Sequence, residues 1–175
     1  MRNQRQQVGL TWTIAAVAFA LLFSRPAMCA DSVQVSLDSS KAVPRQVEPL
    51  TERSILRDYK SAWTNLAQAL ESNSIAPLNG SFIGTANAWL NDAITGQQRS
   101  GLTSRYSNQT HHLEAVFYAP EGDVIELHDT ASYHLQILDG NKTIHDEQVT
   151  VHYVVLMTPA SDRWLIRQLQ STPQF

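Results

Sequence analysis

The sequence predicts an α+β fold, in which N-terminal helices pack on one face of a curved antiparallel sheet. Apolar residues recur at three- and four-residue spacing in residues 51–72 and again in residues 79–96, which indicates two amphipathic helical stretches. After residue 110 the spacing changes to alternation of apolar and polar residues, which indicates strands. Because helices and strands are segregated along the chain, the helices are expected to cover one face of the sheet.

The first 30 residues predict an export segment. Residues 1–7 carry two arginines and no acid, residues 8–23 form an apolar run of 16 residues, and small residues follow. This pattern is typical of a secretory signal, and the run is shorter than the roughly 20 residues of a membrane span. We expect an exported domain, periplasmic or extracellular, with residues 1–30 either removed as a signal peptide or retained as a membrane anchor.

Cysteine content and charge exclude several classes of function. Cys29 is the only cysteine, so the rest of the chain has no disulfide and no thiol chemistry. Removal of residues 1–30 leaves ten basic residues against 16 acidic ones, which argues against nucleic-acid binding. The chain has no Gly-x-Ser-x-Gly motif, no glycine-rich phosphate loop and no paired-cysteine metal motif, so we expect no cofactor and no serine or cysteine nucleophile.

Residues 31–50 are polar, contain two prolines and show no sustained periodicity, which predicts a flexible tether. The domain is then expected over residues 51–170. Thr51 is the predicted N-cap of the first helix, with Glu52 in its first turn, and the helix should stop at Asn73.

A second helical stretch is expected to open at residues 79–81 and to end near Gly96 or Gly101. Gly84 weakens its interior, so one helix and two short helices are both compatible with the pattern. Residues 102–106 fit either a strand or a loop.

Four strands complete the predicted sheet, in residues 110–119, 123–138, 147–157 and 163–169. In residues 110–119 the inward face is expected to carry Leu113, Ala115 and Phe117.

The two central strands form the predicted hairpin. A three-residue loop at residues 139–141 pairs odd positions with odd positions and places His128 opposite His152. This pair could share a metal if His112 or Glu114 supplied a third ligand, but the chain has no His-x-His or His-x-x-x-His pair, so no metal site is predicted. The six histidines are expected to face solvent.

Asp129 interrupts the apolar inward face of its strand. Its odd position aims the carboxylate at the helices, where an acid can act as a general base. The alternative is a bulge that turns Asp129 outward, or a hydrogen bond that satisfies it near the sheet edge. Tyr59, Tyr133 and Tyr153 are its nearby candidate partners.

Aromatic residues on the inward faces predict either a packed core or the wall of an apolar pocket. The candidate ligand-binding residues are Tyr59, Trp63, Trp89, Tyr133 and Tyr153. The outer sheet face carries Val116, Tyr118, Val154 and Leu156 at even positions. An apolar patch of this kind predicts a homodimer interface, unless loops or the tether cover it.

Four segments carry a resemblance to a known superfamily. They are SAWTNLAQAL in the first helix, DTASY and VTVHY in the central strands, and the closing RWLI. Over residues 51–169 their arrangement resembles the nuclear transport factor 2-like (SnoaL-like) superfamily. The resemblance implies a cone-like fold with a pocket between sheet and helices, and pairing of subunits through the outer sheet face. That superfamily contains isomerases, dehydratases, hydrolases, ligand binders and periplasmic interaction domains, so the fold alone does not choose among them.

The sequence therefore predicts a noncatalytic interaction or small-ligand-binding domain, because the inward stripes are almost entirely apolar and Asp129 is their exception. An apolar small molecule and a second copy of the chain are the expected partners. One alternative is a small isomerase, dehydratase or hydrolase with Asp129 as general base. Another is a membrane-anchored assembly subunit of an envelope complex, with residues 8–23 as its span.

Overall fold

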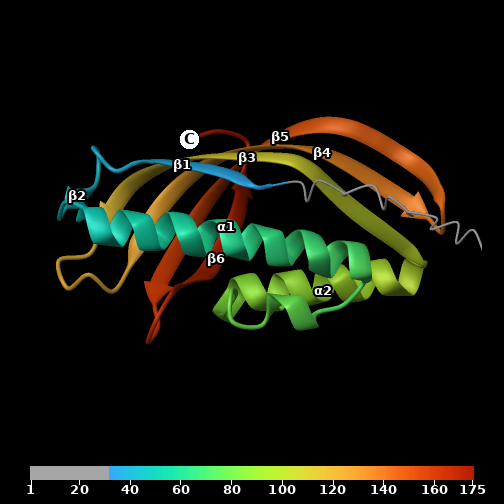
Figure 1. The fold of residues 1–175 in the computed structure, drawn as a ribbon, viewed down its shortest axis with the longest axis horizontal. Helices are drawn as coiled ribbons and strands as arrows, with labels where there is room; N and C mark the ends of the chain where they lie inside the picture. The colour runs from blue at the N-terminus through green and yellow to red at the C-terminus, as the bar shows by residue number, and fades with distance from the viewer. Residues whose placement is uncertain (1–31) are drawn as a thin grey trace, which may run out of the picture.

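The computed structural model describes residues 32–175, in which helices cover one face of a curved six-stranded sheet (Figure 1). The elements in chain order are β1 (Gln34–Asp38), β2 (Val43–Pro44), α1 (Pro49–Ser72), the short 3-10 helix η1 (Ala76–Leu78), α2 (Gly84–Ser100), β3 (Leu102–Tyr118), β4 (Ile125–Asp139), β5 (Lys142–Pro159) and β6 (Trp164–Thr172). The predicted α+β class is confirmed. The predicted export segment, residues 1–30, lies outside the described residues. Within residues 32–175, no helix combines the length and apolar character needed to cross a bilayer.

The strand order is β1-β3-β4-β5-β6, with β2 paired to the far end of β3. The sheet is mixed rather than purely antiparallel, because β1 and β2 both run parallel to β3. The prediction of a flexible tether is therefore wrong, since residues 34–38 and 43–44 belong to the sheet and Val33 is buried in the core. The sequence did carry a signal for β1, because Val33, Val35 and Leu37 alternate with polar residues and face the core, but the polar composition and prolines of the surrounding segment concealed it.

Helix α1 begins at Pro49 and not after Thr51, so the predicted N-cap is wrong. Glu48 occupies the cap position, and Pro49 suits the first turn because its missing N–H would have no partner there. Glu52 lies in the first turn as expected, and Asn73, with a φ of 50°, caps the C-terminal end. The buried stripe of the helix consists of Ile55, Tyr59, Ala62, Trp63, Leu66, Ala69 and Leu70.

Helix α2 is one continuous helix. Gly84 begins it, with a φ of 57°, and does not interrupt its interior. Gly101 ends it in the left-handed conformation, with a φ of 68°. The chain between the two helices is anchored to the last strand, because the Ile83 N–H donates to the Ile166 carbonyl.

The β4–β5 hairpin pairs odd positions with odd positions, as predicted, but its register differs by two residues. Its closing pair is Asp139 with Lys142, so the loop has two residues, and a bulge beside the tip restores the odd pairing. His128 therefore lies opposite Val154, and the predicted pairing with His152 is wrong. Within residues 32–175, no group of three or more potential metal-ligating side chains comes together.

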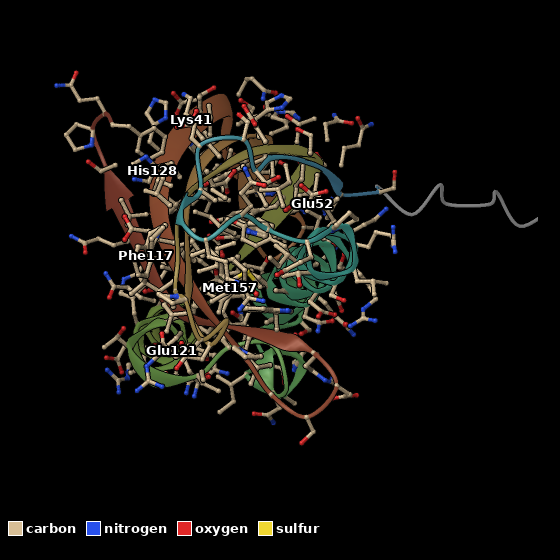
Figure 2. The ribbon with its side chains drawn as sticks, turned by 90° about the vertical axis from the view of Figure 1, so that its left-hand side faces the viewer. Lys41, Glu52, Phe117, Glu121, His128 and Met157 are labelled. Atoms are coloured by element: carbon tan, nitrogen blue, oxygen red, sulfur yellow. The ribbon has the colours of Figure 1, made fainter. Side chains whose placement is uncertain are left out.

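Strand β3 is longer than predicted, because residues 102–106 belong to it. A register shift between Ala115 and Phe117 changes which side chains face the core. Tyr118 is only 3% exposed, whereas Phe117 is 38% exposed, so both predicted orientations are wrong. Figure 2 shows Phe117 and His128 on the side of the sheet away from α1, with Met157 inside the molecule.

Candidate ligand-binding site

Asp129 projects from β4 into the core, as its odd position predicts. It is completely buried. The Tyr59 hydroxyl of α1 donates a hydrogen bond to Asp129 Oδ2 at 2.7 Å, and His111 Nδ1 of β3 lies 2.8 Å from the same oxygen. A carboxylate away from water needs such partners, because burial removes its hydration.

His111 is buried, so the prediction that all histidines face solvent is wrong for this residue. Its ring packs against Trp63, with ring centroids 4.3 Å apart, and meets Tyr59 edge-on. The sequence carried a signal for this placement. His111 continues the odd-numbered series of Leu113 and Ala115, both of which are buried.

The polar cluster is only partly satisfied within the described residues. Asp129 Oδ1, His111 Nε2 and Trp63 Nε1 are buried there without a hydrogen-bond partner. Burial, reinforced by the charge of Asp129, raises the pKa of Tyr59 well above its usual value. Tyr59 is therefore held as a protonated donor to the carboxylate.

An apolar pocket of about 220 Å³ lies beside this cluster, between the helices and the sheet. Its wall is made of Trp63, Leu66, Leu70, Trp89, Leu90, Ala93, Gln97, Ser104, Tyr106, Tyr153 and Leu169. Trp63 is buried in this wall, whereas Trp89 is 52% exposed. Asp129 is not among the lining residues, so the buried acid does not reach the pocket surface.

The Ser104 and Gln97 side chains in the pocket wall are already hydrogen-bonded, whereas the Trp63 Nε1 donor has no partner within residues 32–175. Ser104 Oγ donates to Gln97 Oε1 at 2.6 Å, and Gln97 Nε2 donates to the Leu70 carbonyl at 2.7 Å. Burial raises the pKa of Tyr153 to about 12, so its phenol is neutral at physiological pH. The pocket therefore presents aromatic and aliphatic surface with no free charge.

Three of the five candidate ligand-binding residues line this pocket, namely Trp63, Trp89 and Tyr153. Tyr59 does not, because its hydroxyl is bound to Asp129. Tyr133 is not in the wall either, and lies next to it, with its hydroxyl 3.3 Å from that of Tyr153.

Tyr106 is a lining residue that sequence reasoning missed. Its ring stacks on Tyr133, with centroids 4.5 Å apart. The segment that contains Tyr106 fitted a strand or a loop equally well, and only its membership of β3 turns the ring into the core.

No family model and no curated protein sequence matches the chain. Among solved structures, the fold is similar to the crystal structure of the intermembrane space region of the chloroplast protein ARC6. The TM-score is 0.54 at 14% sequence identity, and the match covers 73% of this chain and 98% of the other. At this identity the likeness concerns the fold alone, and it agrees with the α+β class.

Proposed function

We propose that this domain is noncatalytic and binds a small apolar molecule, preferably an aromatic one, in the pocket between Trp63 and Trp89. The pocket wall carries this proposal, because it combines several aromatic rings with the already paired side chains of Gln97 and Ser104 and carries no charged residue. Its volume of about 220 Å³ suits a ligand of one or two rings. Such a ligand is smaller than the drug-sized molecules that occupy pockets of roughly 300–1,000 Å³.

The environment of Asp129 argues against catalysis. A general base must come within hydrogen-bonding distance of the proton that it removes. Here Asp129 is completely buried, its Oδ2 has two partners, and it does not line the pocket. The alternative of a small isomerase, dehydratase or hydrolase is favoured by one observation, which is that Asp129 Oδ1 has no partner within the described residues.

The wider setting is also part of the proposal. The helices on one face of a curved sheet, with a pocket between them, support a cone of the nuclear transport factor 2-like type. The leader pattern in residues 1–30 supports export, either free or anchored through residues 8–23. The similar solved structure is itself an intermembrane-space region, and the proposed location of this domain outside the cytosol agrees with that.

Homodimer formation through the outer sheet face remains a proposal with a changed set of residues. Tyr118 leaves the predicted patch, since it packs against Trp164 inside the molecule. Phe117 replaces it beside Val116 on β3, and Val154 and Leu156 are half-buried on β5, with β4 between the two strands.

Calorimetric titration with indole tests the proposed function. We expect saturable binding with a negative heat-capacity change, since apolar surface is buried. Replacement of Trp89 by alanine should weaken binding roughly tenfold, which corresponds to the loss of about 1.4 kcal/mol.

Phe175→Ala is the matched control, because it removes an aromatic ring that is as exposed as that of Trp89 and is not in the pocket wall. Its affinity for indole should equal that of the unmodified protein. Equal losses in the two variants, or no binding by the unmodified protein, would contradict the proposal.

A further inference from the structure

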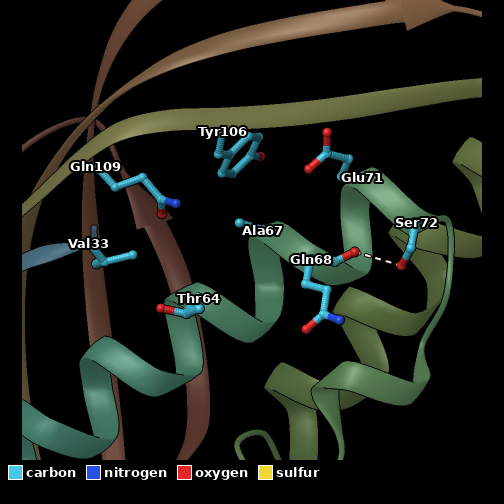
Figure 3. A pocket seen from close by; sticks show the side chains of 8 residues that line it. All are labelled: Val33, Thr64, Ala67, Gln68, Glu71, Ser72, Tyr106 and Gln109. Carbon is cyan, nitrogen blue, oxygen red and sulfur yellow. Dashed lines mark hydrogen bonds between the residues drawn. The ribbon is translucent and has the colours of Figure 1, made fainter. Parts of the chain in front are cut away.

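A second pocket lies along α1 and has a different chemistry. Its volume is about 310 Å³, and it is bounded by α1, β3 and Val33 at the start of β1 (Figure 3). Tyr106 lines this pocket as well as the apolar one. Apart from Val33, Ala67 and Tyr106, the lining side chains are polar.

Both hydroxyl groups in this wall already donate a hydrogen bond to a backbone carbonyl of α1. Thr64 Oγ1 donates to the Lys60 carbonyl at 2.9 Å, and Ser72 Oγ donates to the Gln68 carbonyl at 2.6 Å (Figure 3). Because each hydroxyl has only one proton, both oxygens are left as acceptors. A ligand that binds them must bring its own donors.

Gln109 adds a further acceptor. The residue is only 4% exposed, and its Oε1 is buried with no hydrogen-bond partner within residues 32–175. Leaving such an oxygen unpaired is unfavourable, because it loses its hydrogen bond to water and gains none in the protein. The side chain extends from β3 toward α1 into the pocket (Figure 3), and the terminal torsion of glutamine is soft, so a turn of the amide presents the oxygen to a ligand.

Glu71 supplies the one negative charge in the wall. Arg105 binds only one of its two oxygens, because both Nε and Nη2 of the guanidinium lie 2.8 Å from Glu71 Oε1. The Oε2 atom is left to accept from a ligand. The acceptors of this pocket thus include two hydroxyl oxygens, an amide oxygen and a carboxylate oxygen.

We propose that this pocket binds a primary ammonium group. An ammonium group has three N–H donors and no acceptor, which complements these four acceptors. Gln109 Oε1 and Glu71 Oε2 are its principal partners, and a short apolar stem lies against Val33, Ala67 and Tyr106. The group can belong to a free alkylamine or to the N-terminus of a peptide. This proposal does not depend on ligand binding in the apolar pocket.

Amide-resolved NMR titration in phosphate buffer tests this proposal, with n-butylammonium representing the free amine and C-terminally amidated trialanine representing the peptide. We expect at least one probe to shift the amide signals of Thr64, Gln68 and Gln109. Gln109→Leu should weaken that binding about three- to tenfold, in line with the loss of one hydrogen bond. Glu71→Gln, an exposed change that leaves the core intact, should weaken it as well.

Two controls separate donor recognition from simple charge attraction. Tetramethylammonium carries the charge without N–H donors and should leave the same signals unmoved. Gln34→Leu makes the matched substitution at an exposed position on β1, and it should bind as the unmodified protein does. The proposal is overturned if neither probe shifts these signals, if tetramethylammonium shifts them equally, or if both Gln109→Leu and Glu71→Gln retain full affinity.

Discussion

Asp129 is buried among aromatic rings, and its hydrogen bonds decide whether the fold tolerates it. Two elements each supply one partner, Tyr59 from α1 and His111 from β3. Removing one partner of a buried polar pair leaves the other without solvation, which costs more than the pair itself contributes. Asp129 therefore ties helix to sheet, and we interpret it as structural.

Asp129→Asn should lower the free energy of unfolding by about 1–3 kcal/mol, because an amide oxygen accepts from Tyr59 and His111 more weakly than a carboxylate oxygen does, and the amide adds an NH2 donor in a buried place. Urea denaturation measures this change. Asp92→Asn, an exposed position on α2, is the control and should shift stability by less than about 0.5 kcal/mol. Unchanged stability in Asp129→Asn, together with loss of a measured activity, would favour the enzymatic alternative.

At the level of elements, the sequence was informative wherever a side-chain pattern repeated several times. The inward stripe of α1 and the odd face of β4 are long, so a local irregularity does not hide them. The errors arise at single-residue irregularities. The two-residue loop with its bulge displaced the register of β5, and the bulge before Phe117 exchanged its orientation with that of Tyr118. A bulge leaves no mark in composition, because it depends on the partner strand.

The candidate site, like the fold, was predictable where its residues lie on regular elements. Trp63, Trp89 and Tyr153 lie on long regular elements and were found, whereas Tyr106 lies beyond an irregularity in β3 and was missed. The hydrogen bond between Asp129 and His111 depends on the pairing of β3 with β4. Local periodicity cannot predict which strands pair.

The start of α2 gives a prediction at this scale. Gly84 has a φ of 57°, and a Cβ there would lie 3.2 Å from the Arg167 carbonyl oxygen. Gly84→Ala should therefore destabilise the protein by about 1–2 kcal/mol. Gly96 lies within the same helix with nothing within 4 Å of an added Cβ.

Gly96→Ala should accordingly stabilise the protein by about 0.5–1 kcal/mol, since alanine is the better helix former. Thermal unfolding of both variants compares the two effects directly. Equal shifts of the same sign would mean that α2 does not begin at Gly84 in the way described.

For the whole molecule, the concentration of tyrosines in the core predicts sensitivity to alkali. Burial raises the pKa of Tyr59, Tyr106, Tyr133 and Tyr153 above the usual value, and that of Tyr153 reaches about 12. The unfolded chain loses these protons near pH 10, whereas the folded protein retains them. The folded state thus binds more protons above about pH 10, and its stability falls as the pH rises.

Below about pH 9 we expect these tyrosines to cause no change in the free energy of unfolding with pH. Between about pH 10 and 12 the free energy of unfolding should decline. Urea denaturation across this range measures the decline, and the tyrosinate absorption band reports the ionisation. Tyrosines that all ionise near pH 10 in a protein that stays folded would contradict the buried cluster.

The central claim is that the space between the helices and the sheet is a ligand pocket and that Asp129 stays outside it. A high-resolution crystal structure of the protein with indole soaked in tests this most directly. The account predicts indole density between Trp63 and Trp89, with Asp129 bound only to Tyr59 and His111. A pocket filled by its own side chains, or indole in contact with Asp129, would contradict it.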